Sequence, residues 1–413
     1  MIGLFQPSIK EDKLDRRCFN FMILDIFFIP LFPLFSISLS LPILIYWYYI
    51  RWERTKFEKE RHFFSIIIVL MIFSTLFSLL GFEGSSYHTT FSTSIKRFFQ
   101  YIFSFWYFFF FLYFFSKYDR KINSIIFWGV IYITIFAIIY SFNRDLFIYI
   151  KQILCPFDPQ INRWLNKELL VFRYNFLWAD PNNVAYAATS LVLFYLVEEK
   201  KEVIYKYILL VCLSFILLCT MSFGGLGVAF VLVSYIVFFT NSLNNSKTSI
   251  ILGIIAIIGI ILFIYTNLDY FQEIYSTGIE RRHSIYGNQG IAGGGGRMAD
   301  FIHGLKEIQP LFLIVGSGQE GFVTEIGHIY LICMYGLPVY IFFMYIMFGK
   351  KRGQKFIQYL TIIPMFVGFT INIAIGEQKY LLIILLISAY YAAIPYKNKF
   401  INYENLPLHN NIR

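Results

Sequence analysis

A polar stretch between two hydrophobic segments, residues 267–327, gathers residues that could bind an anion and move a proton. It holds Arg281 and Arg282, then four consecutive glycines that end at Arg297. Just past its end stands His328, where the next apolar segment begins. Several guanidinium groups in a partly dry cleft can neutralise a diphosphate, and imidazole is the usual general base near neutral pH. These residue types predict a site for a phosphorylated substrate.

Arg297 is the most specific of these cations because of its place beside a predicted helix. It opens an amphipathic pattern with apolar residues at helical spacing: Met298, Phe301, Ile302, Leu305 and Ile308. A cation at a helix N-terminus opposes the helix dipole, so helix stability alone would not favour it, whereas the free backbone amides there bind anions. For Arg281 and Arg282 the alternative is attraction to anionic lipid headgroups. No Gly-Lys-Ser/Thr follows the glycine run, so it is not a P-loop.

His328 is the candidate general base. Its predicted place is the N-terminus of an apolar helix, where the helix dipole disfavours the charged imidazolium and keeps the ring neutral. A neutral imidazole can accept a proton from a hydroxyl group. The alternative is an interfacial histidine that only makes hydrogen bonds. His283 and His303 are weaker candidates, because neither is fixed against a predicted rigid element.

An earlier polar stretch, residues 143–182, supplies another arginine. Asp180 and Pro181 form a helix start, with an acceptor side chain at the N-cap and proline at the first helical position. That local role explains both residues without a site. Arg173 lies among aromatic residues, and two interpretations stay open: its guanidinium reaches the headgroup plane, or it grips a phosphate with its planar fork.

The rest of the chain is strongly hydrophobic. Of its 413 residues, 58% are hydrophobic and 21% aromatic, and its mean hydropathy is +0.61. Soluble domains are about 45–50% apolar. Apolar runs of about 18 residues or more recur, and each is long enough to cross a bilayer as a helix. The sequence predicts an all-α polytopic membrane protein with one integral membrane domain over residues 1–413. A β-barrel would show short alternating segments instead.

The apolar runs predict twelve spans, at residues 19–35, 36–50, 63–81, 98–116, 122–142, 183–197, 203–221, 226–240, 249–266, 328–348, 356–374 and 380–395. The first two could form one long helix, but Pro30, Pro33 and Pro42 argue against that. Basic residues flank both ends of this pair, so a hairpin keeps both basic clusters in the cytoplasm.

The net charge of +10 is explained by membrane topology and does not indicate nucleic-acid binding, because Lys and Arg lie mainly in short loops beside the spans. The alternation of spans puts 143–182 and 267–327 on the outer face. Their many cations run against the positive-inside rule there, which indicates a function. Apart from Asp25, the predicted spans carry almost no ionisable residue in mid-helix, which argues against an ion-coupled transporter.

Signals for other chemistry are lacking. The sequence has no HExxH or acidic metal pattern, no CxxC pair and no serine nucleophile elbow. It therefore predicts neither a metal site nor a cofactor.

Four short stretches resemble the O-antigen polymerase and O-antigen ligase superfamily of bacterial inner-membrane glycosyltransferases. They are Arg173 with Asp180-Pro181-Asn182; Met221-Ser222-Phe223-Gly224-Gly225; Gly296-Arg297 leading through Pro310 to Gly316-Ser317-Gly318; and His328 with Tyr330-Leu331 and Tyr335-Gly336-Leu337-Pro338. Each motif alone is weak, so the resemblance depends on their order and spacing around one large outer loop.

The resemblance implies a GT-C-like fold whose large periplasmic loop contains short helices, in a multi-pass protein of the bacterial inner membrane. It implies an undecaprenyl-diphosphate-linked oligosaccharide as substrate, bound at the periplasmic face, with a flippase and a chain-length regulator of the same pathway as partners. Arginines bind the diphosphate in such enzymes, and a histidine activates the acceptor hydroxyl. The matching residues are His328, Arg173 and Arg297, with Arg281 or Arg282 as further cations and Asp180, Asn182 and Tyr330 in support.

Two positions depart from the family pattern. Phe223 stands where members often have arginine, and Ile329 where they often have asparagine. The first change removes a candidate phosphate ligand, and the second leaves open which group orients the histidine.

The composition, rich in Phe, Ile, Tyr, Lys and Asn, favours a polymerase. The alternatives are a ligase that transfers glycan to lipid A-core and a flippase or other transporter of lipid-linked oligosaccharides.

Overall fold

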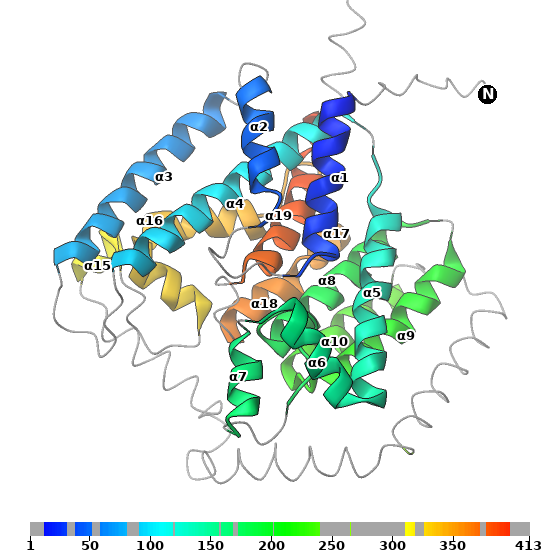
Figure 1. Cartoon of the computed structure of the whole chain (residues 1–413). Coiled ribbons are helices and arrows are strands. Elements are labelled where there is room, and N and C mark those ends of the chain that lie inside the picture. Colours follow the sequence, from blue (N-terminus) through cyan, green and yellow to red (C-terminus); the bar gives the residue numbers. More distant parts are fainter. Residues whose placement is uncertain are drawn as a thin grey trace, which may run out of the picture.

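The computed structural model describes residues 12–30, 38–51, 58–80, 91–118, 120–156, 158–167, 172–200, 202–239, 265, 310–318, 326–371 and 377–396. Within these ranges every regular element is a helix (Figure 1). Five helices are long and apolar enough to cross a membrane: Ser94–Lys117 within α4 (Phe91–Lys117), α5 (Asn123–Phe142), α9 (Val203–Thr220), α16 (Gly327–Phe348) and Gln378–Tyr396, which begins with α19 (Gln378–Ala392). This confirms the class of helical membrane protein, while the other predicted spans stay predictions.

The other helices are shorter or less apolar. They are α1 (Lys13–Phe27), α2 (Leu41–Arg51), α3 (Glu58–Phe77) with the 3-10 turn η2 (Ser78–Leu80), α6 (Arg144–Leu154), α7 (Pro159–Leu165), α8 (Pro181–Glu198), α10 (Phe223–Phe239), α15 (Pro310–Val315), α17 (Phe356–Leu360) and α18 (Ile363–Ile371). The predicted span 249–266 lies outside the described residues, apart from residue 265.

Two helices form the N-terminal hairpin, as the prolines predict. Asp15 near the start of α1 accepts a hydrogen bond from the Trp47 indole near the end of α2, at 2.8 Å. Asp25 near the end of α1 accepts one from the Ser40 N–H just before α2, also at 2.8 Å. With 15 and 11 residues, the helices are about 22 and 17 Å long. Both are shorter than the roughly 30 Å hydrocarbon core of a bilayer.

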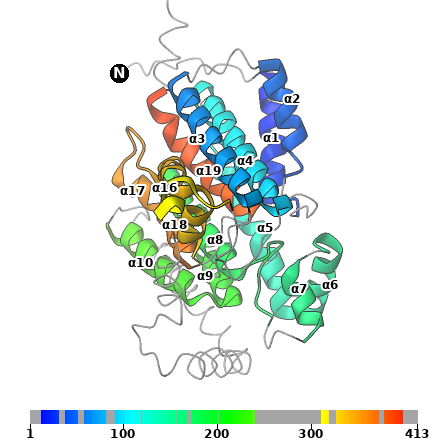
Figure 2. The same ribbon diagram turned by 90° about the vertical axis from the view of Figure 1, so that its left-hand side faces the viewer.

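The helices α4 and α19 lie side by side at the centre (Figures 1 and 2). They run in the same direction, because Gln378 bonds to Ser104 at 3.0 Å and Tyr390 packs on Phe115. Ser104 is ten residues past Ser94, where the candidate span of α4 begins. The first turn of α19 therefore lies about 15 Å along that span, at its middle.

The helix α16 is interrupted in its middle. Gly336 has a φ of +80° and a ψ of 168°, and Pro338 follows it inside the helix. Proline has no N–H, so Pro338 cannot donate to the carbonyl of Met334, and the break at Gly336 separates Leu337 from the carbonyl of Cys333. Two carbonyl groups are thereby released from the regular helical pattern.

Residues 310–318 fill this break. Beyond α15, the N–H of Ser317 donates to the Cys333 carbonyl at 2.7 Å, and that of Gly318 donates to the Met334 carbonyl at 2.9 Å. Backbone groups freed within a bilayer must find partners inside the protein, and this turn supplies both. The Gly316-Ser317-Gly318 motif therefore has a packing role.

The same turn is held by two neighbouring helices. The Ser74 hydroxyl of α3 donates to the Val315 carbonyl, and the Ser94 hydroxyl of α4 donates to the Gly318 carbonyl at 2.5 Å. The helices α3, α4 and α16 thus meet at one small joint.

Gly318→Ala tests the fit of this joint. Gly318 has a φ of +67°, and a Cβ there would lie 1.9 Å from the backbone oxygen of Ser74. We expect the variant to lose about 2 kcal/mol or more of unfolding free energy, measured by thermal unfolding in detergent. The control is Gly227→Ala in α10, where a Cβ meets nothing within 4 Å. Equal stability of both variants would contradict the packing role.

Candidate functional site

The predicted site residues fall into three sets. Arg281, Arg282 and Arg297 lie outside the described residues. Arg173, Asp180 and Asn182 lie around the start of α8, and His328 and Tyr330 lie in the first turn of α16. The structure therefore describes two groups of candidate residues on separate elements.

The start of α8 joins two of the motif stretches. Asp180 caps the helix by accepting a hydrogen bond from the Asn182 N–H at 2.7 Å, with Pro181 at the first helical position. This confirms the predicted helix start. The Ser222 hydroxyl, just before α10, donates to Asn182 Oδ1 at 2.9 Å. A Cβ on Gly225 would lie 2.8 Å from that of Ala185, so glycine lets α10 approach α8 closely.

Arg173 is half-buried on a rigid stretch of loop. Its neighbours Phe172 and Tyr174 are buried. The Tyr140 hydroxyl donates to the Phe172 carbonyl, and the Tyr174 hydroxyl donates to the Ile133 carbonyl, both at 2.6 Å. Both bonds tie the loop to α5, so the backbone at Arg173 is fixed from both sides.

A buried ion pair between α6, which packs on α5, and the start of α7 holds the same loop (Figure 2). Lys151 of α6 lies 2.5 Å from Asp158, the N-cap of α7. It also donates to the Trp178 carbonyl at 2.7 Å and to Asn175 Oδ1. Burial lowers the pKa of Lys151, although Asp158 acts in the opposite direction. This pair was not predicted from the sequence, where its signal is a lysine on the apolar face of an amphipathic helix.

Glu377, the residue before α19, contacts the end of the same loop. It is buried. One carboxyl oxygen accepts the Ala179 N–H at 3.0 Å, and the other accepts the Asn183 side-chain amide at 2.5 Å. Burial raises the pKa of Glu377 to about 8, even though both hydrogen bonds act to lower it. This residue too was missed in the sequence, where it stands just outside the predicted span 380–395.

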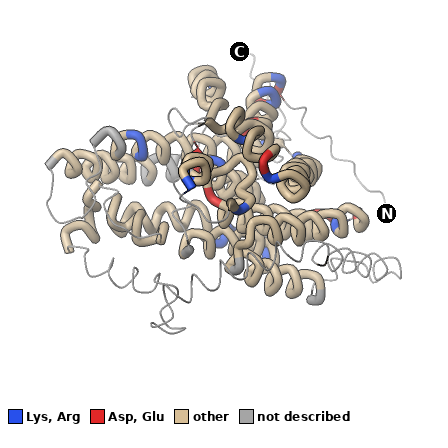
Figure 3. Tube along the Cα trace, turned by 60° about the horizontal axis from the view of Figure 1, so that its bottom comes forward, with Lys and Arg blue, Asp and Glu red and all other residues tan. Residues whose placement is uncertain are grey.

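A second charged cluster lies deep among the helices. Lys379 pairs with Asp25 at 2.5 Å, the Ser40 hydroxyl donates to Asp25 at 2.6 Å, and that hydroxyl lies 2.7 Å from the Tyr107 hydroxyl. Tyr107 belongs to the middle of the α4 span. Figure 3 shows charged residues of both signs near the centre of the molecule. Asp25, the exception among the predicted spans, is thus joined by Lys379, one residue before the predicted span 380–395, and this buried pair weakens the case against an ion-coupled transporter.

His328 is half-buried in an aromatic setting. Its Nδ1 lies 3.2 Å from the Tyr340 hydroxyl, and its ring packs on Phe366 and Phe369 of α18. Its Nε2 is buried beside the Phe366 backbone but has no hydrogen-bond partner of acceptable geometry in the described part of the chain. The Tyr340 hydroxyl thus contacts one ring nitrogen, and the imidazole also lies against the Phe366 backbone without a regular hydrogen bond to it.

The helix α18 contacts both groups of candidate residues. It packs on α8, whose start carries Asp180 and Asn182, and on α16, where its Phe369 ring lies 5.8 Å from that of His328. Tyr330 is buried one turn from the start of α16. The structure therefore links the two groups through α18 but brings His328 into no described contact with Asp180 or Asn182.

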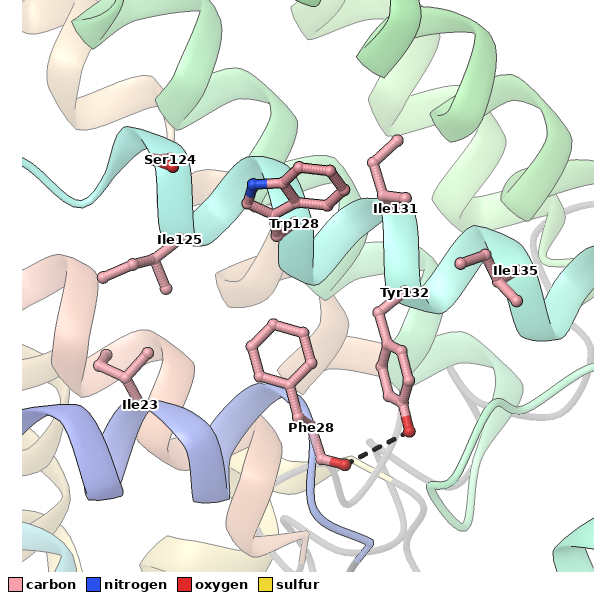
Figure 4. A pocket seen from close by; sticks show the side chains of 8 residues that line it. All are labelled: Ile23, Phe28, Ser124, Ile125, Trp128, Ile131, Tyr132 and Ile135. Atoms are coloured by element: carbon pink, nitrogen blue, oxygen red, sulfur yellow. Dashed lines mark hydrogen bonds between the residues drawn. The ribbon is translucent and has the colours of Figure 1, made fainter.

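A shallow groove between α1 and α5 is the pocket of Figure 4. Its volume is about 410 Å³, and its lining is almost entirely hydrocarbon. Trp128 on its rim is 59% exposed, and Tyr132 closes one end by a 3.4 Å hydrogen bond to the Phe28 carbonyl. No charged side chain lines it, so it is not a site for a diphosphate.

Within the described ranges, no group of three or more His, Cys, Asp or Glu residues could hold a metal ion. Comparison with known proteins gives no further identification: no family model, no curated protein and no solved structure matches the chain. The family resemblance therefore stays a prediction from the motifs.

Lys151→Met tests the buried pair. The change leaves Asp158 as a buried charge without its counter-ion, so we expect a loss of about 3–5 kcal/mol of unfolding free energy. Adding Asp158→Asn should recover a large part of that loss. Lys200→Met at an exposed position is the control, with an expected change within about 0.5 kcal/mol. Denaturant unfolding in detergent measures all three, and an effect of Lys151→Met as small as the control's would rule out a stabilising pair.

Proposed function

We propose that the chain is a bacterial inner-membrane glycosyltransferase that polymerises undecaprenyl-diphosphate-linked glycan repeat units. It crosses the membrane about twelve times in this proposal, with loops 143–182 and 267–327 at the periplasmic face. The observation that carries the proposal is His328, because its Nδ1 is held by Tyr340 while its buried Nε2 has no partner in the described residues. A general base needs one ring nitrogen oriented and the other able to accept a proton. Because Nε2 is buried in the structure, the proposal requires the side chains over it to move when the acceptor hydroxyl binds.

In the proposed reaction, the non-reducing-end hydroxyl of one lipid-linked glycan attacks the anomeric carbon of another. His328 takes the hydroxyl proton as the new glycosidic bond forms and the bond to the diphosphate breaks. Arg173, Arg297 and either Arg281 or Arg282 stabilise the departing diphosphate. A single displacement inverts the anomeric centre, so retention of the donor's configuration would contradict this mechanism.

Tyr340 is the proposed orienting partner of the histidine, in place of the asparagine that family members often carry next to it. The two residues are twelve positions apart, or about 18 Å along a straight helix. The break at Gly336 accounts for their 3.2 Å contact. The Tyr340 hydroxyl can fix which ring nitrogen of His328 carries the proton.

Transport of a lipid-linked oligosaccharide is a second candidate function. The buried Asp25–Lys379 pair favours it, because ionisable residues inside a membrane often mark ion or proton pathways. The purified protein in detergent, supplied with defined lipid-linked repeat units, distinguishes the candidates. Elongation supports the polymerase, transfer only to lipid A-core supports the ligase, and no transfer to either acceptor supports transport.

His328→Ala should lower the elongation rate by about 10²–10⁴-fold, the usual contribution of a general base. Tyr340→Phe should cause a smaller loss, because the imidazole remains but its orientation is no longer fixed. His62→Ala, on the predicted cytoplasmic side, is the control and should elongate at the normal rate. Full activity of His328→Ala would remove the histidine from the mechanism.

Arg173→Ala should slow elongation by about 10²-fold or more if its guanidinium stabilises the leaving group. Arg173→Lys keeps the charge but loses the planar fork, so partial recovery is expected. The exposed Arg163 of α7 provides the matched control, and Arg163→Ala should leave the rate unchanged. Equal rates for the two alanine variants would favour the headgroup interpretation of Arg173.

A further inference from the structure

Glu377 differs from the other buried charged groups near it. Lys151 is matched by Asp158 and Lys379 by Asp25, each at 2.5 Å. Glu377 instead receives hydrogen bonds from two neutral donors, the Ala179 N–H and the Asn183 amide. An ionised carboxylate is costly to bury without a counter-ion, and such a group takes up a proton instead.

Within the described part of the chain, the charged and titratable groups that face Glu377 do not change this balance. Asp180, before α8, is a carboxylate and disfavours a second negative charge. Lys151, from α6, favours the ionised form but is already paired with Asp158. Tyr380, on α19, carries a phenol, which is uncharged at neutral pH by its ordinary pKa of about 10. Burial is the largest influence, and the pKa of Glu377 is raised to about 8.

We propose that Glu377 is a positioning residue that binds a proton, and that its protonated form holds the segment from Phe172 to Asn183 against α19. The carboxyl group bridges the end of the loop at Ala179 and the first turn of α8 at Asn183. With the Asn183 amide turned so that its unpartnered oxygen faces Glu377, the protonated carboxyl donates its O–H to that oxygen and still accepts the Ala179 N–H. Loss of the proton removes this donor and places a negative charge beside Asp180, which weakens the bridge. The segment carries Arg173, so the consequence for activity rests on the proposed function.

The proton on Glu377 changes how the stability of the folded protein depends on pH. The pKa of Glu377 is about 8 in the folded state, against 4.5 for the ordinary carboxyl group. Between these values the folded state holds a proton that the unfolded state has released. The contribution of Glu377 to stability is therefore fully present below pH 4.5 and is lost as the pH rises through about 8.

Glu377→Gln removes the titration and keeps the shape. Its carbonyl can accept the Ala179 N–H, and its amide faces Asn183, whose Oδ1 is buried without a partner and can rotate toward it. We expect the Tm of the wild type in detergent to fall between pH 5 and pH 8 and this slope to flatten in Glu377→Gln. The exposed carboxyl of Glu202 is the control, and Glu202→Gln should keep the wild-type slope. An unchanged slope in Glu377→Gln would overturn the proposal.

Two further measurements keep the proposal testable. If Glu377→Gln does not fold, infrared spectroscopy of the wild type decides, because a protonated-carboxyl band must persist at neutral pH and disappear near pH 8. The absence of such a band overturns the proposal. In the elongation assay, the KM for the lipid-linked donor should rise above pH 8 in the wild type but not in Glu377→Gln. If no glycan is elongated at all, the proposed function fails, while the slope of Tm against pH still decides whether Glu377 binds a proton.

Discussion

Every backbone N–H and C=O group inside a membrane needs a hydrogen-bond partner. This constraint governs the arrangement of α16. Its break at Gly336 frees two carbonyl groups, and the turn at Ser317 and Gly318 supplies donors to both. The same break brings Tyr340 back to His328. One local irregularity therefore explains the Gly316-Ser317-Gly318 motif, the packing of residues 310–318 on α16 and the contact that orients the candidate base.

Three consecutive side chains at the start of α19 connect the loop before α8 with the helices α4 and α1. Glu377 reaches the loop before α8, Gln378 reaches Ser104 of α4, and Lys379 reaches Asp25 of α1. Polar groups at mid-depth have few possible partners, so each contact fixes its neighbour's place. This joint sets where the loop with Arg173 lies relative to the central helices.

Local features could be predicted from the sequence, and contacts between distant segments could not. The helix start at Asp180 and the split between α1 and α2 follow from nearby prolines and polar caps, and both are present. Pro364, in the first turn of α18, is a similar signal that divides the predicted span 356–374 into α17 and α18. The partners of Lys151, Glu377 and Tyr340 depend instead on how helices pack and where α16 bends, which hydrophobic periodicity does not encode.

The joint at residues 315–318 also makes distant helices mechanically dependent on one another. Ser74 and Ser94 hold the same turn that spans the two halves of α16. A tilt of α3 or α4 therefore pulls on the segment that sets the angle between those halves. The distance between the imidazole of His328 and the phenol of Tyr340 therefore depends on the positions of α3 and α4, helices to which neither residue belongs.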